Sequence, residues 1–356
     1  KPFADAANKT AIATFKKVLT KSHDGKDIYP VKYNVWENAK GFKKVIPETN
    51  SKEEVLNSVS IIPKEANPVG DLRSPWAIML PNHFEKTEAI RGKSEWIQGR
   101  KGVTADLNGI YFLEILDVDE KNQLVLIETR PNAGKKDIGK AKRFWIEPDL
   151  LYPLVKGASD FSSCYFKPKN DLYVLVPNKG ITKSYLLDAE DIVEGDLKKT
   201  HRYFESYQEL LADRSTYKMR LKKYAYYMIY NVGEYTFAPY KVIWAEQSGK
   251  FEAAVVSSKE MPLKGIQPYV PDHKIYFVDC DDKNKAHYLC GLLTAPIVKE
   301  FVESHTIAIQ VSNIFKHMEL PVFKKSESSH KKLALIVEKA HNETDKLKRQ
   351  ELIVKA

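Results

Sequence analysis

The chain has 356 residues, 43% hydrophobic and 29% charged, a composition typical of a soluble globular protein with material for about two domains. Its 56 lysines and arginines exceed its 47 aspartates and glutamates, and the net charge of +9 favours polyanionic partners without proving them. No apolar run approaches the roughly 18 residues needed to cross a bilayer, so the sequence argues against a membrane role.

The cysteines and the first residue add two expectations. Cys164, Cys280 and Cys290 lie far apart without metal-ligand spacing, which predicts reduced thiols, no metal site and a cytoplasmic location. The chain begins with Lys1 rather than Met and has no signal-peptide pattern, so we expect a piece of a longer protein.

The first predicted elements lie before residue 85. Residues 12–19 fit a helix or a buried strand, because their apolar positions satisfy both periods. Residues 29–36 alternate and predict a strand. Ser51, with Glu54 three residues later, predicts a capped helix. The proline-bearing residues 63–81 are expected to connect two units.

Two basic segments follow. Gly99-Arg100-Lys101-Gly102 is expected to form a loop that leads through Thr104 and Asn108 into a strand at 110–116. Residues 130–143, which end in Lys142 and Arg143, are expected to form a flexible loop. Each loop fits a phosphate contact, and each equally fits a surface loop whose charges are only solvated.

Strands and helices alternate along the rest of the chain. Residues 110–116 and 124–129 predict a hairpin, and residues 144–156 are apolar enough to belong to the core. Further strands are expected at 172–176, 251–257 and 275–278, and helices at 201–213, 286–293 and 297–302. Residues 328–355 predict one terminal helix, with a single apolar stripe formed by Leu333, Val337, Ala340 and Leu347.

The stretch from Tyr224 to Glu246 carries eight aromatic residues around a glycine-bearing bend at 232–234. It directly follows a run of cations, namely Lys218, Arg220, Lys222 and Lys223. Aromatic faces beside cations can grip nucleic acid. The same pattern is typical of a buried strand pair, so a core hairpin is the alternative interpretation.

The residues 230–242, Tyr-Asn-Val-Gly-Glu-Tyr-Thr-Phe-Ala-Pro-Tyr-Lys-Val, and the later Val-Pro-Asp-His-Lys at 270–274 resemble the C-terminal half of bacterial N6-adenine DNA methyltransferases of restriction-modification systems, including fused type IIG-like enzymes. The Gly-Arg-Xaa-Gly-Xaa-Thr block at 99–104 is similar to the beginning of their target recognition domain. The resemblance implies a mixed α+β fold, with a β-rich recognition domain and peripheral helices after a short remnant of an α/β methyltransferase domain. The implied division is a catalytic remnant at 1–45, a connector at 46–85, the recognition domain at 86–325 and a C-terminal helix at 326–356.

The implied function is sequence-specific binding of double-stranded DNA. Arg100, Lys101, Lys142, Arg143, Arg220 and Lys223 are expected to contact phosphates, and Thr104, Asn108 and Asn231 to read base edges. The resemblance also suggests that Phe3 stacks on a flipped adenine. A non-catalytic protein-interaction domain, or a stand-alone specificity module, is the alternative.

The motifs of methyl transfer are missing from the sequence. Neither a glycine-rich loop for S-adenosylmethionine nor an Asn/Asp-Pro-Pro-Tyr/Phe loop for the flipped base occurs, so we expect no catalysis and no cofactor in this piece alone. The resemblance places S-adenosylmethionine in the parent protein, an adenine DNA methyltransferase that could also be fused to an endonuclease. The missing N-terminal catalytic domain is the implied second partner.

Overall fold

The computed structural model describes residues 29–39, 51–178, 180, 197–248, 250–305 and 314–356. The chain divides into two compact units, Lys1–Arg91 and Gly92–Ala356. Phe3 and the ambiguous element at 12–19 lie outside the described residues. The predicted four-part division of the chain remains a prediction.

The described residues form a mixed α+β structure rich in strands, which confirms the predicted fold class. The strands are β1 Val31–Asn38, β2 Val59–Pro68, β3 Trp76–Met79, β4 Arg100–Lys101, β5 Phe112–Asp119, β6 Leu124–Thr129, β7 Arg143–Ile146, β8 Leu151–Val155, β9 Phe161–Ser162, β10 Tyr165–Phe166, β11 Tyr173–Leu175, β12 Tyr240–Ala245, β13 Ala253–Val256, β14 Ser258–Met261, β15 Gly265–Pro268, β16 Val270–Pro271 and β17 Ile275–Cys280. The α-helices are α1 Lys52–Ser58, α2 His83–Lys86, α3 Asn108–Tyr111, α5 Lys198–Glu205, α6 Gln208–Ala212, α7 Lys283–Thr294, α8 Pro296–His305, α9 Ser328–Asn342 and α10 Lys346–Lys355.

The first unit contains an antiparallel sheet in the order β1-β2-β3. Helix α1 begins as predicted: the backbone N–H of Glu54 donates to Ser51 Oγ at 3.2 Å, and the Ser51 N–H donates to the Glu54 carboxylate at 2.7 Å. Residues 63–81, expected to connect two units, supply most of β2 and all of β3. The prolines fit because Pro63 and Pro68 lie in strands whose partners still pair around them.

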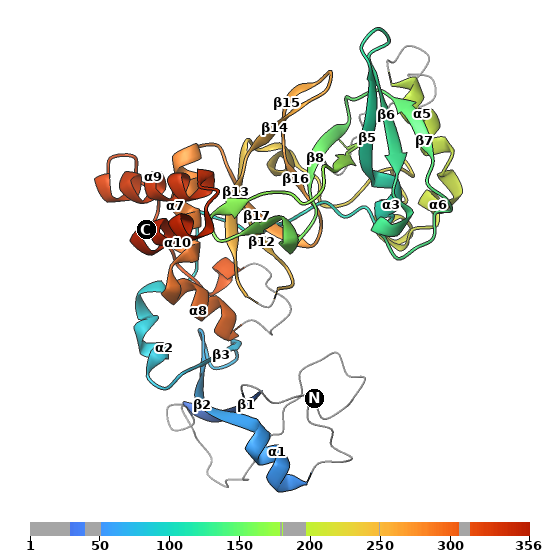
Figure 1. Cartoon of the computed structure of the whole chain (residues 1–356). Helices are drawn as coiled ribbons and strands as arrows, with labels where there is room; N and C mark the ends of the chain where they lie inside the picture. The colour runs from blue at the N-terminus through green and yellow to red at the C-terminus, as the bar shows by residue number, and fades with distance from the viewer. Residues whose placement is uncertain (1–28, 40–50, 179, 181–196, 249, 306–313) are drawn as a thin grey trace. The chain divides into compact units, whose positions relative to one another are not determined.

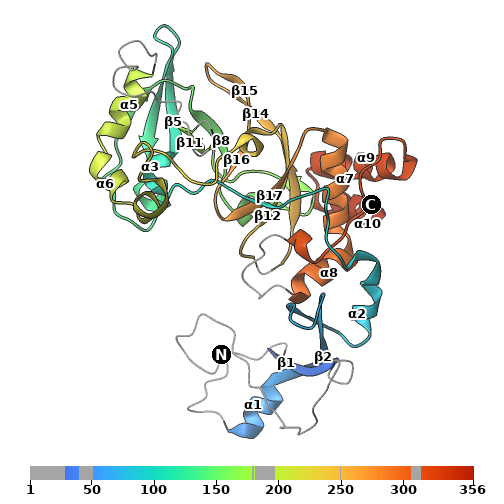
Figure 2. The same ribbon diagram turned by 180° about the vertical axis from the view of Figure 1, so that it is seen from behind.

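In the second unit, a six-stranded sheet has the order β16-β8-β11-β5-β6-β7. The predicted hairpin of β5 and β6 is confirmed, with Leu113 paired to Thr129 at one end and Asp119 to Leu124 at the other. The strand begins at Phe112, later than expected, because residues 108–111 form the short helix α3. Helices α3, α5 and α6 lie beside β5, β6 and β7 (Figures 1 and 2).

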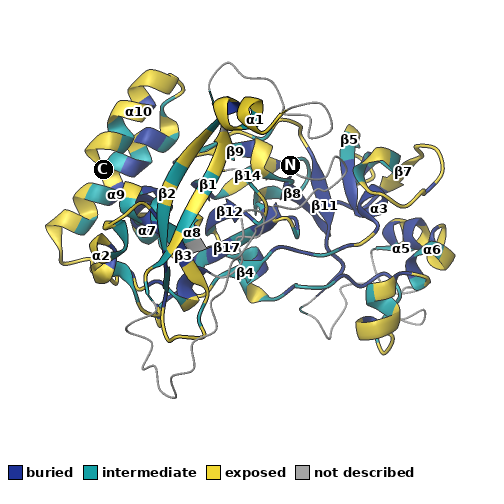
Figure 3. Ribbon diagram, turned by 90° about the horizontal axis from the view of Figure 1, so that it is seen from below, coloured by how far each residue is buried: buried dark blue, intermediate teal, exposed yellow. Residues whose placement is uncertain are grey.

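A four-stranded antiparallel sheet in the same unit has the order β13-β12-β17-β4. Arg100 and Lys101 belong to its edge strand β4, so the expectation of a loop there is wrong. Their backbone pairs with Phe277 and Tyr276 of β17, which fixes the direction of both side chains. Strands β12 and β17 are deeply buried, and helices α7, α9 and α10 lie near this four-stranded sheet (Figures 1 and 3).

The C-terminal residues form two helices rather than the predicted single one. The chain leaves α9 after Asn342, and Asp345 caps α10 by accepting hydrogen bonds from the backbone N–H groups of Leu347 and Lys348. Val337 and Ala340 are buried as expected, but Leu347 is 77% exposed. Leu347 therefore does not continue the buried stripe of α9. The predicted helices at 286–293 and 297–302 are confirmed as α7 and α8, divided at Pro296.

The predicted hairpin within Tyr224–Glu246 is wrong. Only residues 240–245 form a strand, β12, and residues 224–233 form no regular element beyond a single bridge. Asn231 has a left-handed backbone with φ of 58°, which interrupts any extended strand at that point. The stretch does contribute to the core at two places, because residues 227–229 and 242–244 are buried.

Two further findings concern membrane-spanning helices and the cysteine residues. Among the described residues, no helix is both long and apolar enough to cross a membrane. The three cysteines carry free, buried thiols, and Cys164 and Cys290 approach each other with 4.0 Å between their Sγ atoms although 126 positions separate them in the sequence.

Candidate nucleic-acid interface

A buried arginine holds the irregular aromatic segment in place. Arg214 is only 3% exposed and lies three residues before the start of the π-helical turn Tyr217–Leu221. Its guanidinium donates to the carbonyls of Ala105, Tyr226 and Met228 at 3.0, 2.6 and 2.7 Å, and to Leu211 at 3.0 Å. One side chain therefore satisfies carbonyls from three segments that have no sheet partner.

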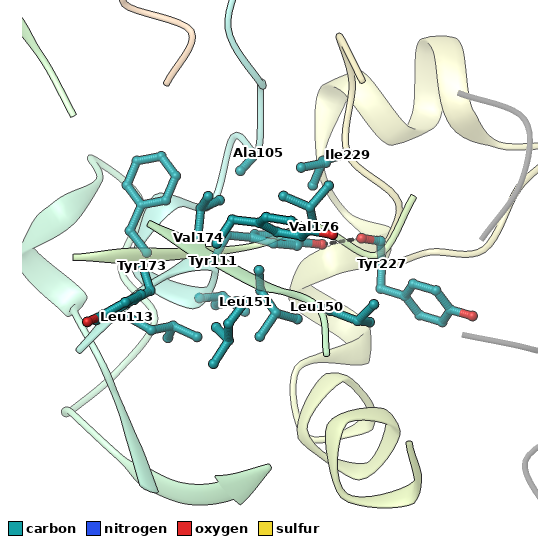
Figure 4. Close-up of a cluster of buried hydrophobic side chains, with 14 of the residues drawn as sticks. Ala105, Tyr111, Leu113, Leu150, Leu151, Tyr173, Val174, Val176, Tyr227 and Ile229 are labelled. Carbon is teal, nitrogen blue, oxygen red and sulfur yellow. Dashed lines mark hydrogen bonds between the residues drawn. The ribbon is translucent and has the colours of Figure 1, made fainter. Parts of the chain in front are cut away.

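Two more side chains complete this support. Asn178 and Ile229 exchange two hydrogen bonds, in which the Asn178 amide donates to the Ile229 carbonyl at 2.8 Å and accepts from its N–H at 3.1 Å. The buried Tyr111 hydroxyl donates to the Tyr227 carbonyl at 2.5 Å (Figure 4). Burial raises the pKa of Tyr111 well above its usual value, so it remains a donor. The backbone of 226–229 is thus fixed by side chains instead of by a sheet.

A close backbone contact joins the segment after β4 to the Val-Pro-Asp-His-Lys motif. The Val103 N–H donates to the Pro271 carbonyl at 2.8 Å, and the Gly102 N–H donates to Ile275 at 2.9 Å. A Cβ atom on Gly102 would lie 2.3 Å from the Asp272 carbonyl oxygen, so only glycine fits there. Asp272, 1% exposed, accepts from the backbone N–H of His273 at 2.6 Å.

The residue after this contact meets the aromatic segment. Thr104 and Tyr230 form an antiparallel bridge with backbone hydrogen bonds of 2.9 and 3.0 Å. Beside the bridge, the Asn231 amide donates to Thr104 Oγ1 at 3.1 Å, and both side chains are half-buried. The structure therefore brings together two of the three predicted base-reading residues, which are 127 positions apart in the sequence.

Two arginines lie over tyrosine rings next to this pair. The Arg220 guanidinium carbon is 5.0 Å from the centroid of the Tyr230 ring, and that of Arg100 is 4.9 Å from the Tyr235 ring. Burial raises the pKa of Tyr235, and the positive charge of Arg100 partly offsets this rise. We name the group the aromatic seam; it consists of Arg100, Thr104, Arg220, Tyr230, Asn231 and Tyr235.

The other predicted cations are placed differently. Lys101 forms an ion pair of 2.5 Å with Glu246, and Arg143 one of 2.8 Å with Glu128 across strands β7 and β6. The Lys142 ammonium lies 5.5 Å from the centroid of the Tyr207 ring, and Lys223 is exposed. These residues are not part of the aromatic seam.

Asn108 occupies a different environment from the two polar residues of the seam. It is 7% exposed, and its buried Oδ1 has no hydrogen-bond partner among the described residues.

Sequence reasoning missed Arg214 and Asp213. Asp213 accepts hydrogen bonds from the ammonium groups of Lys136 and Lys218 at 2.8 and 2.6 Å, and these lower its pKa to about 2. The helical pattern at 201–213 gave no sign that a carboxylate at its end would meet a lysine 77 positions earlier.

Possible metal ligands and the most tightly packed glycines can be examined directly. Among them, no group of three or more His, Cys, Asp or Glu side chains could hold a metal ion. The glycines that require their small size face the chain itself: a Cβ on Gly109 would lie 2.8 Å from the Arg130 carbonyl, and Gly102 faces Asp272. Neither position leaves open backbone for a nucleotide-like ligand, so these glycines do not fit a cofactor loop.

Comparison with known proteins gives a limited similarity. No protein-family model matches the chain. Over 159 residues, 45% of this chain, the sequence is 25% identical to the type II methyltransferase M.NspV of Nostoc sp. (strain ATCC 29411 / PCC 7524), and the aligned part spans 30% of that protein. The solved structure of the type IIL restriction-modification enzyme MmeI in complex with DNA aligns with 83% of this chain and 36% of that chain, with a TM-score of 0.42 and 12% identity.

Proposed function

We propose that this chain binds double-stranded DNA sequence-specifically, as the target recognition portion of an N6-adenine DNA methyltransferase of a restriction-modification system. The sequence similarity to part of M.NspV supports the methyltransferase assignment. In this proposal the catalytic domain of the same protein binds S-adenosylmethionine and carries out methyl transfer. The present chain binds the DNA, and the whole protein acts in the cytoplasm.

The aromatic seam is the observation that carries the DNA-binding part. Among the described residues, Arg100 and Arg220 form no ion pair, and each guanidinium rests on a tyrosine ring. Stacking leaves the N–H groups of an arginine free to bind the paired oxygens of a phosphate. Arg220 is exposed, whereas Arg100 is half-buried and its Nε has no partner among the described residues. Two such groups flanking a polar pair form a suitable surface for a polyanion.

The polar pair at the centre of the seam supplies the reading function. The Asn231 amide has donors and an acceptor that match an adenine edge in the major groove. Its hydrogen bond to Thr104 fixes the orientation of the amide, and the left-handed backbone at Asn231 holds the side chain at this position. Arg100 and Arg220 would position the duplex, and Asn231 and Thr104 would select the sequence.

The remaining predicted contacts belong to the same proposal with secondary roles. Lys142 and Lys223 are exposed and can reach phosphates directly. Lys101 and Arg143 must first leave Glu246 and Glu128, so each would contribute less.

The test is equilibrium binding of the chain to a pool of random duplex DNA over a salt series, followed by sequencing of the retained fraction. The proposal expects a steep loss of affinity with salt and an enriched motif. Binding without enrichment would limit the function to phosphate contacts. The absence of binding at low salt would support the protein-interaction alternative instead.

A further inference from the structure

An exposed apolar side chain stands in the middle of the basic turn that adjoins the aromatic seam. Met219 is 75% exposed. Outside the terminal helix α10, no large apolar side chain among the described residues is more exposed. Its neighbours in the sequence are cations on both sides, Lys218 and Arg220, with Lys222 and Lys223 directly after.

The turn that presents Met219 is firmly attached. Its next residue but one, Leu221, is fully buried, and the Tyr217 hydroxyl donates to the Tyr224 carbonyl at 3.3 Å. The Lys218 N–H donates to the Arg214 carbonyl at 3.0 Å, which connects the turn to the buried arginine. The exposure of Met219 is therefore imposed by a fixed backbone and not by a loose loop.

The surrounding charges restrict what can cover this side chain. Lys218 is held by Asp213 and Arg220 rests on Tyr230, so cations are fixed on both sides of Met219. An apolar protein surface would have to desolvate the exposed Arg220, Lys222 and Lys223 without supplying counter-charges. A nucleic-acid groove supplies phosphates to the cations and an apolar base surface between them.

We infer that Met219 is a specificity-determining residue that contacts the 5-methyl group of a thymine in the major groove. This inference rests on the proposed function, because it requires that the turn faces duplex DNA. Among the four unmodified bases, thymine alone presents a methyl group in that groove, and apolar side chains recognise it by contact. The unbranched thioether of methionine adapts readily to such a surface.

The experiment begins with the motif selected by the unaltered chain. Each thymine of that motif is replaced in turn by deoxyuridine, which removes only the 5-methyl group. Affinity is then measured for the unaltered chain, Met219→Ala, Met219→Leu and the control Leu347→Ala, whose side chain is also highly exposed but lies on α10. Circular dichroism verifies that each variant is folded.

The inference expects one thymine at which deoxyuridine weakens binding by about fourfold, the value for one buried methyl group. Met219→Ala should lose this sensitivity, whereas Met219→Leu and Leu347→Ala should keep it. A selected motif without thymine, or a methyl effect that persists in Met219→Ala, would overturn the inference and leave DNA binding intact. If the unaltered chain binds no duplex, the proposed function fails, and the inference fails with it.

Discussion

Two groups of cations in the second unit look alike in the sequence and differ in the structure. The aromatic seam holds Arg100 and Arg220 over tyrosine rings. In the other group, which we name the acid-paired edge, Lys136 and Lys218 share Asp213, and Arg143 pairs with Glu128. In the first group no carboxylate of the described residues competes with a polyanion, and Arg220 is exposed; in the second group a polyanion must compete with carboxylates that are already in place.

The comparison shows that net charge alone is a poor guide to a binding surface. The seam is built on buried supports, Arg214 and the close approach at Gly102, whereas the acid-paired edge is held by ion pairs near the surface. Substitutions at the buried supports should therefore reduce stability. Substitutions of seam residues should reduce DNA affinity strongly, and substitutions at the acid-paired edge should change DNA affinity only slightly.

The largest effect is expected for Arg214→Ala. The change removes four hydrogen bonds and leaves buried carbonyls of Ala105, Tyr226 and Met228 without donors, which should reduce the free energy of unfolding by about 3 to 5 kcal/mol. Urea denaturation followed by circular dichroism measures it. Arg143→Ala, at an exposed arginine, is the control and should change stability by less than about 1 kcal/mol. Equal effects would show that the seam has no special support.

A smaller loss of stability is expected for Gly102→Ala. The new Cβ would lie 2.3 and 2.4 Å from the carbonyl oxygens of Asp272 and Pro271, so the two segments must separate, at about 2 to 3 kcal/mol. Gly157→Ala is the matched control, because nothing lies within 4 Å of its Cβ position and its φ of −179° suits any residue. Thermal unfolding of both variants checks the difference, and equal melting temperatures would contradict the close contact.

The sequence predicted elements better than it predicted their connections. The cap of Ser51 and Glu54, the β5–β6 hairpin and the break at Pro296 follow from local signals, and all three are confirmed. The Tyr224–Glu246 hairpin failed because Arg214, Asn178 and Tyr111 offer its backbone hydrogen bonds that no local pattern reveals. Strand β4 was missed because two residues carry too little periodicity to be recognised.

The sequence predicts some residues of the candidate site but not the partners that those residues contact. Motifs and basic runs point to four residues that the fold brings into one seam, namely Arg100, Thr104, Arg220 and Asn231. Their tyrosine partners could not be assigned, because aromatic spacing does not tell which ring faces a cation. The carboxylates that hold Lys101 and Arg143 are 145 and 15 positions away, so no local pattern distinguishes these cations from the others.

At the seam itself, Arg220→Ala should weaken binding to the selected duplex about tenfold and reduce the slope of log affinity against log salt by about one, because one phosphate contact is lost. Arg143→Ala should weaken binding by less than about twofold, because its guanidinium is engaged by Glu128. Fluorescence anisotropy at several salt concentrations distinguishes the two. If the two variants lose affinity equally, then stacking on a tyrosine ring or pairing with a carboxylate does not determine which cations bind DNA.

The smallest effect, and one of opposite sign, is expected for Asp213→Asn. Removing this carboxylate frees Lys136 and Lys218 next to the seam, so affinity for duplex DNA should rise about two- to threefold with a steeper salt dependence. Acidification cannot replace the substitution: hydrogen bonds from Lys136 and Lys218 lower the pKa of Asp213 to about 2, so the carboxylate stays charged at any pH above that value. Glu351→Gln, on the exposed side of α10, changes the net charge by the same amount and should leave affinity unchanged. A similar gain in both variants would mean that total charge drives binding and that the position of the freed cations beside the seam does not matter.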